Sequence, residues 1–195
     1  MSARAIPLWG EYRVFAPTRA GRDAMLRFLA GVAGAEGVDE ALQALREAAH
    51  GRVAIAFEDG GLLQWLDAWQ NAILPADYHA REAVRQAERR ARGLFAAFGR
   101  DPDSLAGRPI GELSLLEARL VGFVKAMLLE PELLVLDCLF ERLGSDECRE
   151  VRRWIDYWRA RYPLRRVLYV GLAEPAEGLL AGFAPLEAVL AKEAA

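Results

Sequence analysis

The feature that most constrains the fold is the stretch of residues 111–144, GELSLLEARLVGFVKAMLLEPELLVLDCLFERLG. Its first half carries apolar residues at helical spacing: Leu116, Leu120, Phe123, Val124, Met127 and Leu128. Residues 131–137 then form a short apolar run that ends in Asp137, a pattern typical of a buried strand. The stretch therefore predicts an apolar-faced helix followed by a buried strand with an acid at its carboxyl end.

Strands and helices are also predicted to alternate along the rest of the chain. The predicted strands are residues 11–16, 52–57, 166–171 and 186–190. The predicted helices are one with Met25, Phe28 and Leu29 on its apolar face, residues 39–49, 81–98 and 145–161, and a short one from Glu174. This order predicts an α/β protein with a mainly parallel central sheet flanked by helices. At 195 residues we expect a single domain, 1–195.

Composition limits the setting in which the chain acts. A net charge of -3 gives no electrostatic reason to expect nucleic acid as a partner. Cys138 and Cys148 are too few for a disulfide framework, and the first residues lack the pattern of a signal peptide, so we expect a reducing cytoplasm. No stretch approaches the roughly 20 apolar residues of a membrane span. We therefore expect no direct membrane insertion.

The first predicted strand and helix enclose a loop with a partial motif. A strand, loop and helix in this order are the context of a phosphate-binding loop, whose amides and helix N-terminus bind an anion. The residues resemble the Walker A motif Gly-x-x-x-x-Gly-Lys-[Ser/Thr], with changes. Ala16 stands at the first Gly, Gly21 is kept, Arg22 replaces the Lys, and Asp23 replaces the magnesium-binding hydroxyl.

Residues 111–144 extend this resemblance to the ATP-binding-cassette (ABC) transporter ATPases. Leu113 and Ser114 fall where the signature motif Leu-Ser-Gly-Gly-Gln begins, and Asp137 falls where the Walker B strand delivers its magnesium-binding Asp. The changed positions are Leu115 and Leu116 for the signature glycines, Cys138 for the catalytic Glu, Gly144 for the D-loop Asp, and Leu172 for the switch His. The resemblance implies a P-loop NTPase-like fold, a helical subdomain at about 76–115, and a reduced N-terminal β subdomain.

Residues 58–63, 69–75 and 78–79 are similar to the Q-loop region of cassettes of the Mla or MCE-associated group, which drive phospholipid transport. Glu58 takes the place of that family's Gln. In cassettes this region abuts the groove that receives a helix of the transmembrane permease, and the residues placed to line it are Leu62, Leu63, Trp65 and Trp69. The alternative is that both Trp residues close the core, since aromatic residues indicate an interface only when exposed.

The altered positions admit two interpretations. Asp23 in a first helical turn would satisfy free N–H groups and serve as the chain's own anion, paired with Arg22; alternatively Arg22 contacts a phosphate and Asp23 ligates magnesium. Leu115 and Leu116 are expected to close the signature site sterically. Asp137 either holds a loop or binds Mg²⁺. Neither His50 nor His79 is placed to activate Cys138.

With so many working positions changed, we expect a pseudo-ATPase with no catalytic residues and no cofactor. Its expected role is that of a structural or regulatory subunit of a membrane transporter, of lipid or MCE type. Expected partners are a permease, an active ABC ATPase subunit or a second copy, which would place the chain on the cytoplasmic side of the inner membrane. The alternatives are an atypical ATPase that uses Arg22, Asp23 and Asp137 with Mg-ATP, and a cytoplasmic scaffold unrelated to transport.

Overall fold

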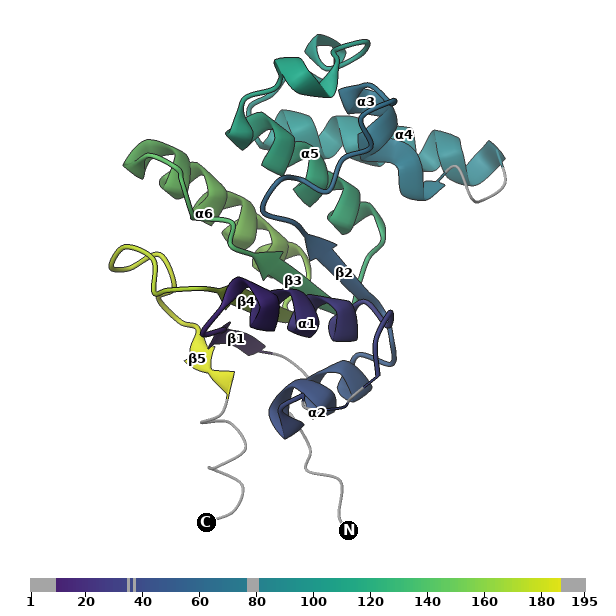
Figure 1. Ribbon diagram of the computed structural model, residues 1–195. Helices are drawn as coiled ribbons and strands as arrows, with labels where there is room; N and C mark the ends of the chain where they lie inside the picture. The colour runs from purple at the N-terminus through teal and green to yellow at the C-terminus, as the bar shows by residue number, and fades with distance from the viewer. Residues whose placement is uncertain (1–9, 35, 37, 77–80, 187–195) are drawn as a thin grey trace.

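A five-stranded parallel sheet forms the centre of the computed structural model, which describes residues 10–34, 36, 38–76 and 81–186 (Figure 1). The strand order is β2-β3-β4-β1-β5, and each strand pairs in parallel with its neighbour. The strands are β1 (Gly10–Phe15), β2 (Val53–Ala56), β3 (Leu133–Asp137), β4 (Arg166–Gly171) and β5 (Ala184–Pro185). Every residue of β3 and β4 is buried, as expected for central strands of a covered parallel sheet.

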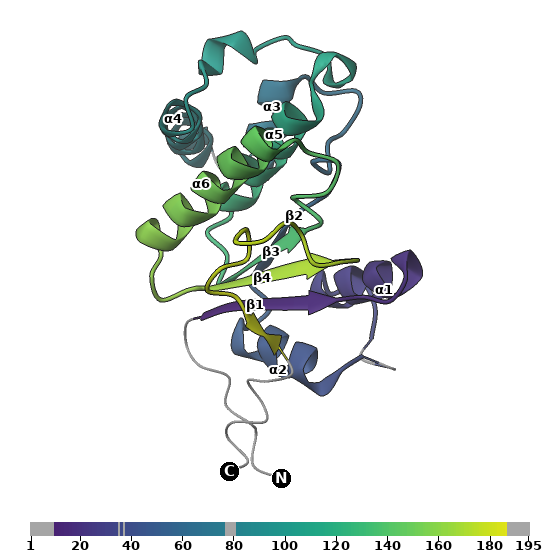
Figure 2. The same ribbon diagram turned by 90° about the vertical axis from the view of Figure 1, so that its left-hand side faces the viewer.

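Helices cover both faces of the sheet. On one face, α1 (Arg19–Leu29) and α2 (Glu40–Ala48) pack on alternate strand residues such as Leu133 and Val135. On the other face, α5 (Leu115–Leu128) and α6 (Ser145–Arg161) pack on the intervening residues such as Leu134 and Leu136. Figure 2 shows α5 and α6 above the sheet and α2 below it. The alternation of side chains along each strand thus divides the apolar interior into two layers.

A group of helices lies beyond α5, away from the sheet (Figures 1 and 2). It contains α3 (Ala68–Ile73), α4 (Arg81–Ala97) and three 3₁₀ turns, Leu74–Ala76, Pro102–Ser104 and Ile110–Glu112. Aromatic contacts join this group to the rest: the Phe98 ring lies 6.0 Å from Phe123 of α5 and 6.1 Å from Trp154 of α6, centroid to centroid. The group falls where the helical subdomain is predicted, although the boundaries 76–115 stay a prediction.

The parallel α/β architecture is confirmed, whereas the prediction of a helix from Glu174 is wrong. Instead of the helix expected from Glu174, bends and turns lead to β5. Gly178 and Gly182 have φ of 85° and 91°, which ends any helical path. The last described strand is the two-residue β5, just before the predicted 186–190, and 187–190 lie outside the described residues. The same is true of 78–79 and of 1–9, where a reduced β subdomain would begin.

Candidate functional site at the carboxyl edge of the sheet

The loop between β1 and α1 is only three residues long, because α1 begins at Arg19. Thr18 caps the helix: its Oγ1 accepts from the Gly21 amide at 3.1 Å, and its carbonyl accepts from the Arg22 amide at 3.0 Å. Residues 19–21, expected in the loop, are helical. Two amides that a phosphate-binding loop would offer are therefore committed to Thr18.

Asp23 does not cap α1, which corrects the prediction that places it in the first turn. The first turn of α1 contains no acidic residue, and Asp23 lies one turn further on with a side chain that is 53% exposed. The expected pair with Arg22 is present, since Arg22 Nη2 lies 3.0 Å from Asp23 Oδ1. The pair lies at the rim of the site, and the anion inside the site comes from another residue.

That anion is Glu58, which follows β2 and meets Arg22. Arg22 Nη1 lies 2.6 Å from Glu58 Oε2, 3.5 Å from Asp137 Oδ1 and 3.5 Å from Cys138 Sγ. Burial tends to lower the pKa of Arg22, but hydrogen bonds to Cys138 and Glu58 and the charge of Asp137 raise it above its ordinary value. The guanidinium is thus a fixed, paired cation.

Glu58 connects four parts of the molecule through its polar atoms. Its amide donates to Asp137 Oδ2 at 3.2 Å, and its carbonyl accepts from Arg119 Nε at 2.7 Å. Its carboxylate binds Arg22 through Oε2 and Arg142 Nη2 through Oε1 at 3.0 Å. Burial tends to raise the pKa of Glu58, but the Arg22 hydrogen bond and the charge of Arg142 hold it below the ordinary value.

Asp137 and Cys138 lie behind this pair, at the end of β3. Asp137 is 2% exposed, and its Oδ2 holds the chain at Glu58, the loop-holding role that the sequence left open. Burial raises the pKa of Asp137 and, more strongly, that of Cys138, to about 12. The Cys138 thiol therefore stays protonated at neutral pH. In the part of the chain that the structure describes, no three His, Cys, Asp or Glu side chains are grouped as metal ligands.

Arg119 of α5 is a member of the site that sequence reasoning missed. It is fully buried, and its Nη1 donates to the carbonyls of Leu139 at 3.0 Å and Glu141 at 2.7 Å. Burial lowers the pKa of Arg119. With its Glu58 contact, the side chain joins the loops after β2 and β3. The sequence contains a signal for this role, because Arg119 is a charged residue beside Leu120 on the apolar face of a predicted helix.

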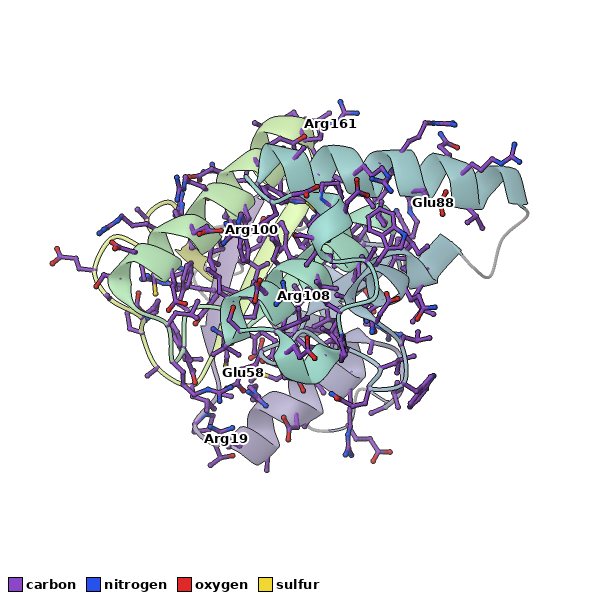
Figure 3. The ribbon with its side chains drawn as sticks, turned by 90° about the horizontal axis from the view of Figure 1, so that it is seen from above. Arg19, Glu58, Glu88, Arg100, Arg108 and Arg161 are labelled. Atoms are coloured by element: carbon purple, nitrogen blue, oxygen red, sulfur yellow. The ribbon has the colours of Figure 1, made fainter. Side chains whose placement is uncertain are left out.

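A cavity of about 520 Å³ opens in front of these residues. The charged side chains that line it are Arg19, Arg22, Arg27, Arg142, Asp23, Glu58, Asp59 and Asp137. Cations and carboxylates are equal in number, so the cavity offers no net positive charge to a polyanion. Figure 3 shows Arg19 of α1 close to Glu58, and their charged atoms are 3.9 Å apart.

The start of α5, where the signature motif would lie, is also closed by its own carboxylate. Ser114 Oγ accepts from the Glu117 amide at 3.2 Å, and Glu117 Oε2 accepts from the Ser114 amide at 2.8 Å, which forms a capping box. Arg108 binds both Glu117 oxygens, at 2.8 and 3.2 Å, and lowers the pKa of Glu117 to about 2. The helix N-terminus thus already has an anion.

Leu115 and Leu116 do not obstruct this helix end together, as the sequence suggested. Leu116 is 7% exposed and belongs to the apolar core, and Leu115 is half-buried. Leu116 therefore packs into the core of its own chain. The amides at this helix end are occupied because Ser114 and Glu117 cap the helix, and Leu116 does not fill the space in front of them.

The four residues predicted to contact a permease divide between core and surface. Leu62 and Trp69 pack against the core, and Trp69 lies near Phe95 with Arg92 over its ring at 5.1 Å. Leu63 is half-buried, and Trp65 is 78% exposed. Of the two alternatives, closing the core applies to Trp69, which packs against the core. The other applies to Trp65, which is an exposed aromatic side chain.

Buried Asn71 fixes the shape of this exposed loop. Its Oδ1 accepts from the Leu63 amide at 2.7 Å, and its Nδ2 donates to the carbonyls of Leu63, Leu66 and Asp67. A buried amide with every group in use rigidifies the chain around it. The loop that carries Trp65 is therefore preorganised.

Leu172, which the family resemblance predicts at the switch His position, does not line the cavity beside Glu58. Its amide lies 3.4 Å from Glu141 Oε1, and its side chain lines a second cavity of about 650 Å³ with Leu143 and Leu179. The structure thus brings Arg22, Asp23, Glu58, Asp137 and Cys138 together and leaves Leu172 and Ser114 apart.

No helix among the described residues is long and apolar enough to cross a membrane.

Comparison with known proteins relates this arrangement to one fold. No protein-family profile and no curated protein sequence matches the chain. Among solved structures, CbiO1 of Clostridium perfringens, part of the ABC transporter complex cbiONQ, matches with a TM-score of 0.61 at 15% identity over 84% of this chain and 68% of that chain.

Two further cassettes match similarly. The dimeric bacterial ABC transporter cassette MJ0796 has a TM-score of 0.61 at 17% identity, over 84% of this chain and 75% of its own. The ABC transporter cassette MJ1267, in its ADP conformation, has a TM-score of 0.61 at 13% identity, over 88% of this chain and 72% of its own. The chain therefore has the P-loop NTPase-like fold of the ABC transporter ATPase cassettes.

Proposed function

We propose that this chain is a catalytically inactive ABC cassette, a pseudo-ATPase that acts as a structural or regulatory subunit of a membrane transporter. The observation that carries the proposal is the pairing of Arg22, at the position of the Walker A Lys, with Glu58 and Asp137. A cation at this position serves phosphate binding only if it is free to meet the phosphate. Here two carboxylates of the chain occupy it.

The backbone and the net charge of the cavity support the same conclusion. Thr18 uses the amides of Gly21 and Arg22, so the loop offers fewer N–H groups to a phosphate. The cavity is balanced in charge, and a nucleotide triphosphate entering it would have to displace Glu58 from Arg22 and Arg142. Glu117 occupies the α5 end in the same way. Both surfaces that would enclose a nucleotide between two cassettes, the Walker A side and the signature side, thus already hold a carboxylate of the chain.

The exposed loop around Trp65 is the proposed contact with a transmembrane permease, of the lipid or MCE type that the Q-loop resemblance indicates. Trp65 projects from a loop that Asn71 holds rigid, and exposed aromatic residues on rigid loops are typical binding anchors. This contact would place the chain on the cytoplasmic face of the inner membrane. An active ABC ATPase subunit or a second copy is the proposed cassette partner, since MJ0796 is dimeric.

One observation favours an atypical ATPase as a second candidate. Asp137 is kept at the end of β3, and its Oδ1 is buried without a hydrogen bond, with Arg22 at 3.5 Å as its ion-pair contact. A divalent cation brought by Mg-ATP could use that oxygen, with Arg22 and Asp23 turned toward the phosphates. The third candidate, a scaffold unrelated to transport, has no feature of its own in its favour.

Isothermal titration calorimetry with Mg-ATP separates the first two candidates. The pseudo-ATPase is expected to show no heat of binding at nucleotide concentrations up to about 1 mM, within the usual range for KM. Binding at micromolar concentration would overturn the proposal and support the ATPase. Asp137→Asn would then be expected to abolish the dependence on magnesium.

Co-purification with a co-expressed permease of an MCE-type transporter tests the partner. Trp65→Ala is expected to reduce recovery of the permease, because it removes the exposed anchor. Leu164→Ala is the matched control, since Leu164 is 71% exposed and lies in the turn between α6 and β4. Failure of the unmodified chain to recover any permease would favour the scaffold.

A further inference from the structure

Glu58 is surrounded by guanidinium groups from two separate segments of the chain. Arg19 and Arg22 come from α1, and Arg142 comes from the loop between β3 and α6. The carboxylate side chain is only 11% exposed, whereas Arg19 and Arg142 are 67% and 61% exposed. A buried anion at the centre of cations that reach in from the surface has the geometry of a ligand in its binding site.

We propose that these arginines form an oxyanion site and that the Glu58 carboxylate is its built-in ligand. Planar guanidinium groups bind carboxylate and phosphate oxygens in the same way, so the site accepts either. This inference rests on the proposed function in one respect: the chain does not use the site for ATP. It goes further by assigning the site a permanent occupant.

Removal of the carboxylate would leave the cations in place around an empty space. Arg22 would keep Asp137 and Asp23, which hold its head toward the cavity. Arg142 would lose the carboxylate that is its ion-pair partner among the described residues. Its φ of 61° is uncommon for a residue with a side chain, and this backbone keeps Arg142 next to the site. A free oxyanion could therefore replace the lost group.

Occupancy of the site is connected to the loop that carries Trp65. Glu58 leads directly into residues 59–67, where Gly60 lies against the backbone of α5 and Lys125 donates to the Gly61 carbonyl. Asn71 then holds Leu63. The carboxylate thus does within the chain what a bound anion would otherwise do, which is to fix the start of this loop relative to α1 and to the loop between β3 and α6.

Anion rescue of a Glu58 variant tests the proposal. Glu58→Ala in the full chain is expected to lower Tm, and sodium phosphate at about 100 mM is expected to raise it again by on the order of 3 °C relative to sodium chloride of equal ionic strength. Sodium acetate, a carboxylate, should rescue in the same direction. The unmodified chain, whose site is filled, should show only the smaller, non-specific stabilisation that phosphate gives folded proteins.

Two matched variants make the result specific. Glu47→Ala removes an exposed carboxylate from α2 and should show no more phosphate effect than the unmodified chain. Arg142→Ala combined with Glu58→Ala removes a cation of the site and should abolish the rescue. If Glu58→Ala does not fold, Glu58→Gln keeps the shape without the charge. Because its amide still fills part of the space, phosphate should stabilise it less than Glu58→Ala but more than Glu47→Ala.

Hydrogen exchange in residues 59–67 gives a second measurement. Exchange in this loop should accelerate in Glu58→Ala and slow again when phosphate is added, while exchange in β4 stays unchanged. A Glu58 variant that folds and responds to phosphate no more than Glu47→Ala would overturn the inference. Micromolar binding of Mg-ATP to the unmodified chain would instead overturn the proposed function, so the two failures are distinguishable.

Discussion

The guanidinium of Arg22 in α1 lies 2.6 Å from the carboxylate of Glu58, which follows β2. Both side chains are 11% exposed, so water screens this pair less than a surface ion pair. Together the two opposite charges neutralise each other. The pair is the centre of a larger charge network, because Arg22 also contacts Asp137 and Glu58 also contacts Arg142. Losing either side chain would therefore leave a largely buried charge with fewer partners.

Arg22→Ala is expected to destabilise the protein by about 3 kcal/mol, because it leaves Glu58 and Asp137 close together without the cation between them. The free energy of unfolding from urea denaturation measures this loss. Arg22→Ala combined with Glu58→Gln should recover part of it, since the second change removes one of the two carboxylates. A double variant as unstable as the sum of the two single variants would show that the residues are not coupled.

The stability of the α5 N-terminus should depend on pH through Glu117. Arg108 lowers the pKa of Glu117 to about 2 from its ordinary value of 4.5, so the ionised form is the one that stabilises the fold. This contribution is fully present above pH 4.5 and is lost as the pH falls toward 2. Because the side chains of Arg108 and Glu117 are 30% and 26% exposed, solvent screening limits it to on the order of 1 kcal/mol.

Urea unfolding between pH 2 and pH 7 measures this contribution. Glu117→Gln should remove it, so the variant and the unmodified chain should differ in stability at pH 7 and converge near pH 2. Glu47→Gln, an exposed glutamate in α2, serves as the control. A difference between Glu117→Gln and the unmodified chain that stays constant over this range would contradict the assignment.

The parallel sheet and its helices could be predicted from the sequence because they depend on short-range patterns. The apolar run that ends at Asp137 allows few structures other than a buried strand, and the 3.6-residue spacing in α5 and α6 appears directly in the residues. The failure at Glu174 has a local cause. Gly178 and Gly182 adopt positive φ, and nothing in a helical pattern reveals which glycines do so.

The site could be predicted only in part, because its contacts join residues far apart in the chain. Arg22 was expected to pair with its neighbour Asp23, and it does, but the decisive partner is Glu58, 36 residues away. Arg142 and Arg119 were not foreseen, since they act on Glu58 across loops whose shape no motif specifies. A motif comparison identifies which positions have changed, and tertiary structure decides which of the new residues meet.

Arg119 is expected to be among the most sensitive positions in the chain. Arg119→Met keeps an unbranched apolar stem but leaves the carbonyls of Glu58, Leu139 and Glu141 without their donor, at a cost of about 3 kcal/mol. Arg153→Met on the exposed side of α6 is the control and should change stability by less than about 0.5 kcal/mol. Equal effects in urea denaturation would mean that Arg119 does not hold the two loops.

Two glycines inside helices should respond in opposite ways to the same substitution. A Cβ on Gly122 of α5 would lie 2.3 Å from the Gly60 carbonyl oxygen, whereas a Cβ on Gly93 of α4 meets nothing within 4 Å. Gly122→Ala should therefore push α5 away from the loop after β2 and destabilise the protein by about 1–3 kcal/mol.

Gly93→Ala is the matched substitution, and it should stabilise the protein by about 0.5–1 kcal/mol through helix propensity alone. Thermal unfolding of the two variants measures both signs. Hydrogen exchange in residues 59–67 should increase in Gly122→Ala only, because that loop rests on the backbone of α5. If both substitutions raise Tm, the close approach of Gly60 to Gly122 does not exist in solution, and the loop that carries Trp65 is not held by α5.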